Sequence, residues 1–443
     1  MIAITVREFA RLTTASIPEQ TLDRAQVSAS AFDWLCGLSA KFSSAGAALV
    51  EVEDRRWLKL ANYVGVLETP CGTRFEILPK HHAEGDCTTK GRALLRRMIA
   101  AAMDLPVRDA DEASLQIFDA PLSEWVMGRF LAALDHLIKR GLRSDYLRVA
   151  AAERYLRGQL DIVRQMRQPP GRQHVFQIRH DVFVQNRPEN RLIKRALEQV
   201  CKQTQSPENW RLAQELRSLL QEIPVTEDVV SDFKRWRTDR MMTHYLPVRP
   251  WCELILYRQM PYSLAGDWRG ISMLFPMEKL FERYVAAALK RDLASDARLV
   301  KQAASHYLCE QAGGQMFRLQ PDLIVQHGAR RWVLDSKWKR LNASNRADKY
   351  GLSQADFYQL FAYGQKYLAG QGEMVLIYPL HRTFDKALPV FDFGGGLTLW
   401  ALPFDLDASC LVDGGLTGLP LRNASRTEYR VPIDHGGRVP AQC

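Results

Sequence analysis

The stretch MFRLQPDLIVQHGARRWVLDSKWKRL (316–341) decides the fold of this chain. It contains two runs rich in β-branched and other apolar residues, RLQPDLIVQ (318–326) and RRWVLDSKWK (330–339), separated by the short segment HGA (327–329). Runs of this composition on either side of a glycine-containing turn are typical of a β-hairpin. We therefore predict two antiparallel strands at this point of the chain.

The register of this hairpin brings two acidic residues together. Whether the loop holds the two residues Gly328-Ala329 or four residues centred on them, Asp322 comes opposite Asp335. Cross-strand partners have Cβ atoms about 4.5–5.5 Å apart, so both carboxylates should lie on one side of the sheet. Lys337 should join them, because residues two apart on a strand point the same way.

These three side chains favour phosphodiester hydrolysis. Adjacent carboxylates repel each other, and a hard divalent cation with oxygen ligands, here Mg²⁺, is the usual means of neutralising them. Asp322 and Asp335 are the expected metal ligands, and the carbonyl oxygen of Ser336 is a further one. The ammonium of Lys337 can orient an attacking water and stabilise charge on phosphorus. The alternative is that Asp335 and Lys337 form an ordinary surface ion pair on a strand.

A helix should precede the hairpin. FPMEKLFERYVAAALKRDL (275–293) has a proline in its first turn and an apolar stripe along one side. On this helix Glu282, or less favourably Glu278, is placed to complete the metal shell. A strand over 298–308 should follow the helix.

A second helix should follow the hairpin. SQADFYQLFAYGQKYLAG (353–370) carries Gln359 and Tyr363 at i and i+4, on a face that can pack near the two acids. The alternative for these two residues is simple helix packing. The predicted order over the whole region is helix, three strands, helix, strand.

Length and composition predict a multidomain α+β protein. The chain has 443 residues, of which 47% are hydrophobic and 25% charged, so it can fold and bury roughly two to four domain cores. A hairpin is expected over 61–80, with its turn near Pro70. The predicted regions are a β-rich mixed N-terminal domain (1–120), a mainly helical middle region (121–265), a C-terminal α/β domain with the αβββαβ order (266–412) and a mobile tail (413–443).

Positive charge is concentrated in the middle of the chain. The formal net charge is +10, and the segment from Lys139 to Arg179 holds ten basic residues against three acidic ones. Tyr146, Tyr155 and Phe176 lie among them. This arginine-rich composition favours a surface that follows the phosphates of a nucleic acid, and the alternative is an ordinary solvated face.

Several classes of protein are excluded or disfavoured. No apolar run is long enough to span a bilayer, and the N-terminal sequence does not resemble a signal peptide, so we expect a cytoplasmic protein without membrane contact. The eight cysteines never form a C-x-x-C pair, which argues against a zinc site and a disulfide framework. No G-x-x-x-x-G-K-[ST] loop is present, so nucleotide hydrolysis would have to come from a partner.

These motifs resemble two nested groups of nucleases. Pro321-Asp322, then Asp335-Ser336-Lys337 and a helix with Gln359 and Tyr363, resemble the PD-(D/E)xK nuclease superfamily, whose core has the αβββαβ order. More narrowly, the chain resembles the McrC family, the nuclease subunits of McrBC modification-dependent restriction systems. That resemblance covers about residues 60–410 and rests on FPMEKLFERYV (275–285), DSKWK (335–339), DFYQLFAY (356–363), NRPENRLIKRAL (186–197), NYVGVLET (62–69) and FEILPKH (75–81).

The resemblance implies a division of labour. An McrB-type AAA+ ring hydrolyses GTP and handles modified DNA, while the McrC-type subunit stimulates GTP hydrolysis and cuts the DNA with Mg²⁺. Residues 1–120 and the helical region would contact the ring, and two complexes could associate for double-strand cleavage. Asp322, Asp335 and Lys337 would be catalytic, supported by Glu282 and Gln359.

Two other functions stay open at this point. The chain could be a non-catalytic subunit that binds DNA or activates the ring, with structural acids. It could also be a stand-alone nuclease of the same superfamily.

Overall fold

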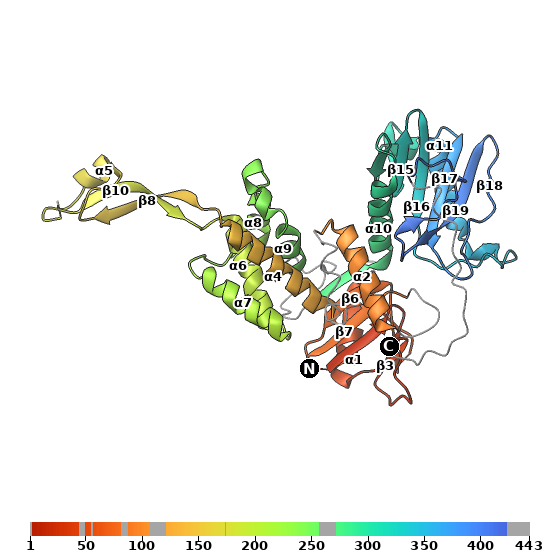
Figure 1. The fold of residues 1–443 in the computed structure, drawn as a ribbon, viewed down its shortest axis with the longest axis horizontal. Helices are drawn as coiled ribbons and strands as arrows, with labels where there is room; N and C mark the ends of the chain where they lie inside the picture. Colours follow the sequence, from red (N-terminus) through yellow and green to blue (C-terminus); the bar gives the residue numbers. More distant parts are fainter. Residues whose placement is uncertain are drawn as a thin grey trace. The chain divides into compact units, whose positions relative to one another are not determined.

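The computed structural model describes residues 2–43, 49–54, 56–80, 87–105, 121–172, 174–256 and 272–422. The chain divides into two compact units, one containing Met1–Leu122 and Gln259–Cys443 and the other containing Ser123–Arg258. Figure 1 shows the elements of each unit. Among the described residues, no helix is both long and apolar enough to cross a membrane.

A four-stranded sheet opens the first unit and contains the predicted hairpin. β6 (Tyr63–Glu68) and β7 (Thr73–Leu78) pair antiparallel around the turn at Pro70, which confirms this prediction. β1 (Ile2–Arg7) pairs parallel with β7. The other edge strand is β11 (Ser272–Pro276), which comes from a distant part of the sequence.

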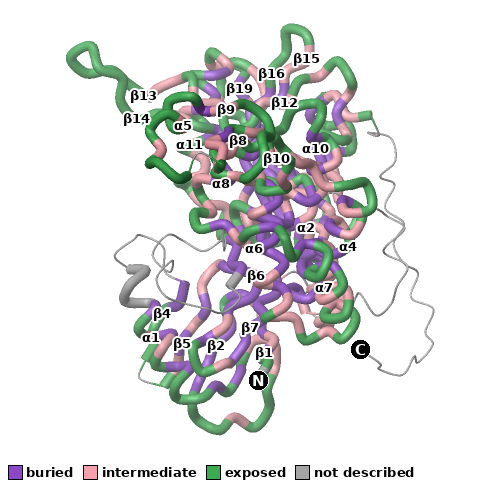
Figure 2. The backbone as a smooth tube through the Cα atoms, turned by 90° about the vertical axis from the view of Figure 1, so that its left-hand side faces the viewer, coloured by how far each residue is buried: buried purple, intermediate pink, exposed green. Residues whose placement is uncertain are grey.

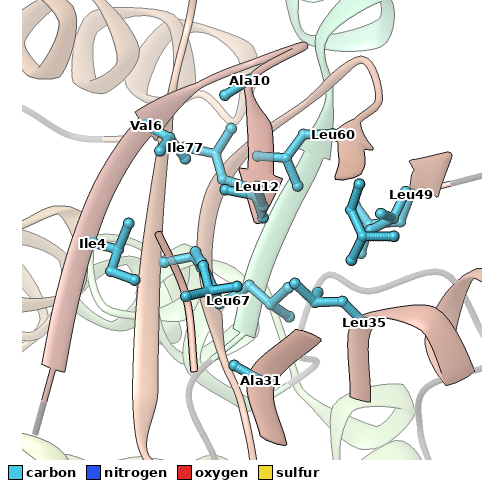
Figure 3. Packing of buried hydrophobic residues seen from close by; sticks show 14 of the residues in the cluster. Ile4, Val6, Ala10, Leu12, Ala31, Leu35, Leu49, Leu60, Leu67 and Ile77 are labelled. Carbon is cyan, nitrogen blue, oxygen red and sulfur yellow. The ribbon is translucent and has the colours of Figure 1, made fainter. Parts of the chain in front are cut away.

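A second small sheet shares a hydrophobic core with the first. Buried aliphatic side chains from both sheets and from one helix form this core, among them Leu12, Leu35 and Ile77 (Figure 3). The elements that complete this part are β2 (Arg11–Thr13), β3 (Arg24–Gln26), α1 (Ala29–Ser43), β4 (Val50–Val52), β5 (Trp57–Leu60) and α2 (Thr88–Ala102).

A seven-stranded mixed sheet forms the C-terminal part of the first unit. Its strand order is β12-β15-β16-β17-β19-β18, and β20 pairs with β19. β12, β15 and β16 run antiparallel, whereas β16, β17 and β19 run parallel. The strands are β12 (Arg298–Lys301), β15 (Leu323–His327), β16 (Arg330–Ser336), β17 (Gly372–Pro379), β18 (Phe391–Asp392), β19 (Leu397–Asp405) and β20 (Cys410–Leu411).

Helices α10 (Met277–Asp292) and α11 (Gln354–Tyr367) pack on this sheet. α11 buries Leu360 in a cluster that includes Leu399 of β19. The ring of Phe281 on α10 instead meets Phe404 of β19 edge to face, at 5.9 Å between centroids. Because successive side chains of a strand alternate between faces, Leu399 and Phe404 point to opposite faces, so the two helices cover opposite faces. The remaining short helix is the 3-10 turn η4 (Lys349–Gly351).

The strands before the acidic hairpin differ from the prediction. The expected strand over 298–308 is two strands, because the chain turns at Gln302, whose φ of 46° lies in the left-handed region. An additional hairpin, β13 (His306–Gln311) and β14 (Gly314–Leu319), follows this turn. The predicted strand over 318–326 is also divided, because β14 ends at Leu319 and β15 begins at Leu323. Pro321 lies between them and has no N–H for pairing with a neighbouring strand.

The second unit combines helices with a projecting arm. Its helices are α4 (Leu122–Arg140), α6 (Pro188–Gln203), α7 (Pro207–Leu219), α8 (Val229–Arg235), η2 (Arg240–Tyr245) and α9 (Arg249–Leu256). Buried Trp251 of α9 meets Trp125 of α4 edge to face, at 5.5 Å between centroids.

The arm was not predicted from the sequence. It contains β8 (Asp145–Glu153), β9 (Gln159–Leu160), α5 (Ile162–Met166) and β10 (Phe176–Val184), which form a three-stranded sheet with one helical turn. It extends away from the helices in Figure 1, and Figure 2 colours much of it as exposed. Since neither face of β8 is fully buried, its sequence has no clear alternation of apolar and polar residues.

The first part of the predicted tail is packed. Thr417 and Leu419 are buried, and the Thr417 carbonyl accepts a hydrogen bond of 3.0 Å from Nε1 of Trp332. The amide of Ala294 donates to the carbonyl of Pro420 at 2.7 Å. Residues 413–422 therefore belong to the C-terminal part of the first unit, in contrast to the prediction. Residues 423–443 lie outside the described part of the chain.

Candidate active site

The two acidic residues come together as their spacing predicts. β15 and β16 pair with His327 opposite Arg330 and Leu323 opposite Leu334. One step further along this register, Asp322 lies opposite Asp335. The turn at Gly328 has a φ of 58°, a left-handed conformation that glycine adopts without strain. The hairpin thus places both carboxylates at the same end of the sheet.

Asp322 is held by the chain that follows Asp335. Its Oδ2 accepts hydrogen bonds from the backbone N–H of Ser336 at 2.9 Å and from the Ser336 hydroxyl at 3.1 Å. Burial raises the pKa of Asp322 to about 7, and the charges of Asp335 and Glu282 add to the rise. Ser336 therefore positions Asp322, while its carbonyl as a metal ligand stays a prediction.

Asp335 forms a close pair with Lys337. Lys337 Nζ lies 2.6 Å from Asp335 Oδ2, and the Asp335 side chain is only 2% exposed, so this is not a surface ion pair. Burial raises the pKa of Asp335 despite the nearby ammonium. Burial alone would lower the pKa of Lys337, but the charges of Asp335, Asp356 and Asp322 outweigh it and raise this pKa. The amine is therefore an ammonium at neutral pH.

The structure distinguishes between the two glutamates of α10. Glu278 is exposed, whereas Glu282 is buried and contributes to the raised pKa values of Asp322 and Asp335. The carboxylate of Glu282 lies 3.1 Å from Lys279 Nζ and accepts a hydrogen bond of 2.9 Å from Gln302 Nε2. Glu282 is therefore the α10 residue that belongs to the site.

Gln302 joins two parts of the site and was missed by the sequence analysis. Its backbone N–H donates to the carbonyl of Asp322 at 2.8 Å, while its side chain donates to Glu282. Its left-handed backbone is unusual for a residue other than glycine, and such conformations concentrate at functional sites. Nothing in the surrounding sequence distinguishes this glutamine from others.

α11 supplies the polar groups around Lys337. Gln359 Oε1 accepts a hydrogen bond of 3.3 Å from Lys337 Nζ, and Gln359 Nε2 donates to the Tyr363 hydroxyl at 2.8 Å. The Tyr363 hydroxyl in turn donates to the carbonyl of Gln320 at 3.0 Å. Asp356 lies 3.9 Å from Lys337 Nζ and was also missed. Its position three residues before Gln359, on the same helix face, is the signal that could have revealed it.

The donor set fits a hard cation. In the described residues no group of three or more His, Cys, Asp and Glu side chains is placed to hold a metal ion. Mg²⁺ usually needs only one or two protein carboxylates, because water and substrate phosphates fill the rest of its shell. Asp322 and Asp335 provide that number, and burial together with the neighbouring carboxylates raises the pKa of both.

Comparison with known proteins gives the family. The family model described as McrBC 5-methylcytosine restriction system component matches residues 58–379. The chain belongs to the McrBC family. The predicted resemblance to components of McrBC restriction systems is therefore confirmed, and the matched range contains every residue of the acidic site.

Two solved structures from Thermococcus gammatolerans share the fold of this McrBC-family chain. One is a half-complex from the tetradecameric assembly of McrB AAA+ hexamers with bound McrC, with a TM-score of 0.69 and 20% identity over 91% of this chain and 94% of that one. The other is the McrBC complex, with a TM-score of 0.52 and 22% identity over 66% of this chain and 88% of that one. No curated protein matches the sequence.

Proposed function

We propose that this McrBC-family chain is a Mg²⁺-dependent DNA endonuclease subunit that cuts modified DNA together with an McrB-type AAA+ ring. The observation that carries the proposal is that Asp322, Asp335 and Lys337 lie together at one end of the adjacent strands β15 and β16. Two carboxylates, Asp335 buried and Asp322 half-buried, and an ammonium at one end of a sheet are suited to hydrolysing a phosphodiester. A purely structural ion pair between Asp335 and Lys337 would not need Asp322 as a second carboxylate beside it.

Each residue has a distinct part in this reaction. Asp322 and Asp335 would hold Mg²⁺, with Ser336 and Glu282 in support, and the ion supplies Lewis-acid activation of the phosphate when bound. Lys337 cannot act as a base while its raised pKa keeps it protonated. It would donate hydrogen bonds to the attacking water and to the phosphate oxygens. Gln359 would hold the ammonium in place from the α11 side.

The hydrolysis itself replaces one P–O bond with another. The water oxygen forms a bond to phosphorus, the bond to the leaving sugar oxygen breaks, and the water proton ends on solvent or on the leaving oxygen. The negative charge that builds on the phosphate oxygens is the charge that Lys337 is placed to stabilise.

A ring partner accounts for features outside the acidic site. The family and the McrB AAA+ hexamers in the similar solved structures support such a partner, and the sequence contains no G-x-x-x-x-G-K-[ST] motif. The arm offers large exposed apolar side chains, among them Tyr146 at 70% and Met166 at 82%. Exposed apolar surface of this kind commonly marks a protein interface. We therefore assign the arm, within the predicted helical region, to contact with the ring.

The central test is loss of cutting with retention of partner activation. Asp335→Ala and Lys337→Ala should abolish DNA cleavage in the presence of the ring, GTP and Mg²⁺, and both should still stimulate GTP hydrolysis. Lys290→Ala, an exposed lysine of α10, is the matched control. Undiminished cleavage by the first two variants would refute the assignment.

The wild-type protein separates the other two functions in the same assay. A chain that stimulates GTP hydrolysis but never nicks DNA with any divalent metal is a non-catalytic subunit. A chain that cuts without GTP and without the ring is a stand-alone nuclease.

A further inference from the structure

A pocket lies next to the candidate active site and has no role in the proposed reaction. Its volume is about 310 Å³. It is lined by residues 338–340 after β16 and by residues 379–381 at the end of β17. Glu8 and Phe9 in the turn after β1, and Lys80, two residues beyond β7, complete the lining. Trp338, which opens the first of these segments, directly follows Lys337.

A buried carboxyl group with one unused oxygen forms part of the wall. Glu8 is fully buried, and its Oε1 accepts hydrogen bonds from the amide of Lys80 at 2.8 Å and from Nε1 of Trp338 at 2.9 Å. Its Oε2 has no hydrogen-bond partner among the described residues. A buried acceptor without a partner is unusual in native proteins, and a donor on a bound ligand would satisfy it.

The rim carries more positive than negative charge. Arg340 donates to the carbonyl of Lys80 at 2.7 Å, which fixes the guanidinium beside the pocket. Lys80 Nζ lies 3.2 Å from Asp23, so its charge is partly balanced. Lys339 is exposed and makes no salt bridge within the part of the chain that the structure describes. A ligand with a negative group would find an uncompensated cation here.

An exposed aromatic ring completes the lining. Phe9 is 40% exposed, although a side chain of this size usually turns inward, and its φ of 63° is a strained backbone conformation for a bulky residue. The fold therefore holds an aromatic ring at the pocket in a conformation that costs free energy. Aromatic faces beside cations are the combination that binds single-stranded nucleic acid, because bases stack on the ring and phosphates meet the cations.

We propose that this pocket binds one nucleotide of an unpaired DNA strand that extends from the candidate active site, with its base against Phe9 and its phosphate at Lys339. The inference rests on the proposed function only for the source of the strand. The burial of Glu8 raises its pKa to about 7, so this carboxyl group can also exist as a donor to a base edge. The volume lies at the lower end of the range for small-ligand pockets, about 300–1,000 Å³.

The test measures DNA binding without any cleavage. The full-length protein is titrated into a fluorescein-labelled single-stranded oligonucleotide in EDTA, and anisotropy gives the Kd. Phe9→Ala should weaken binding roughly 5- to 20-fold, the lower part of the range for loss of one stacked base. Phe9→Tyr keeps the ring and should bind like the wild type. Phe361→Ala removes an equally exposed ring elsewhere and should leave the Kd unchanged.

Lys339→Ala tests the phosphate contact independently. The slope of log K against log salt concentration should fall by roughly 0.7, the value for one phosphate contact with a single strand. Lys290→Ala should leave this slope unchanged. Competition with deoxycytidine monophosphate is measured for the wild type and for both variants. It gives the affinity for a free nucleotide, which is compared with the affinity for the strand.

The outcomes separate the pocket from the proposed nuclease. If both Phe9→Ala and Lys339→Ala bind single-stranded DNA with the wild-type affinity, the proposed nucleotide site is overturned, whatever the result of the cleavage assay. Variants that lose only monophosphate binding would make it a free-nucleotide site and also overturn the inference. Conversely, absence of cleavage in the wild type would refute the nuclease while leaving these binding results unaffected.

Discussion

Asp322 is held in surroundings that favour its protonated form. Its pKa is raised to about 7, so the folded protein binds a proton more tightly there than the unfolded chain does. A raised carboxyl pKa destabilises the fold once the pH rises above the unfolded value near 4, and the full cost is present above the folded value. The free energy of unfolding should therefore fall as the pH rises from about 4 to 7.

Asp322→Asn should remove this loss of stability at high pH, and its side-chain oxygen can still accept the hydrogen bonds from Ser336. At pH 8 and without metal, we expect the variant to be more stable than the wild type by roughly 1–2 kcal/mol, and the difference should vanish at pH 4. Thermal denaturation at both pH values measures it. Mg²⁺ should raise the Tm of the wild type at pH 8 but leave that of Asp322→Asn almost unchanged. Equal metal responses would argue against Asp322 as a ligand.

Residues differ in how far their positions follow from the sequence. The pairing of Asp322 with Asp335 is predictable, because the turn at Gly328 fixes the register of two adjacent strands. The position of Gln302 beside Asp322 and Glu282 is not predictable, since it depends on a left-handed backbone conformation and on how β12 packs in the folded protein. Asp356 lies between these cases, because helix spacing places it with Gln359 but does not show that this face meets Lys337.

At the scale of elements, β11 shows a long-range contact that depends on one glycine. A Cβ added at Gly65 would lie 1.9 Å from the carbonyl oxygen of Met273, so Gly65→Ala should disrupt the pairing of β6 with β11. We expect a loss of about 3 kcal/mol in the free energy of unfolding, measured by urea denaturation. Gly72→Ala is the control, because Gly72 also has a positive φ but no atom lies within 4 Å of the added Cβ. It should cost only about 1 kcal/mol. Equal losses would show that backbone strain alone explains both.

The arm is an element that can be removed cleanly. Asp145 and Val184 are register partners at its base, so their backbones are about 5 Å apart and a Gly-Gly-Ser-Gly linker can replace residues 146–183. Because the arm contributes little to the buried core of its unit, the Tm should change by less than about 3 °C. The variant without the arm should no longer stimulate the GTP hydrolysis that the ring carries out. Full stimulation by this variant would place the ring contact elsewhere, for example on residues 1–120.

At the scale of the whole molecule, the positive charges and the acidic residues of the candidate active site are concentrated in different segments of the chain. The net charge is +10, yet the candidate active site is built around acidic residues. The arginine-rich segment from Lys139 to Arg179 lies largely on the arm, and part of it is internally balanced, since Arg179 pairs with Asp161 at 2.7 Å. On the proposed function, the positive charge would serve to bind DNA, and the acidic pair would serve to cleave it.

Three arginines of this segment are exposed and make no salt bridge among the described residues: Arg154, Arg157 and Arg167. If the segment follows phosphates, changing all three to Gln should lower the slope of log K against log salt for duplex DNA by up to roughly 2.7, which is three contacts at about 0.9 each. Changing Lys202, Arg211 and Lys290 to Gln removes the same charge from helices outside the arm and should leave the slope unaltered. An equal decrease in both triple variants would mean that only net charge matters. An unchanged slope in the arm variant would make the segment a solvated face and leave the arm to protein contacts alone.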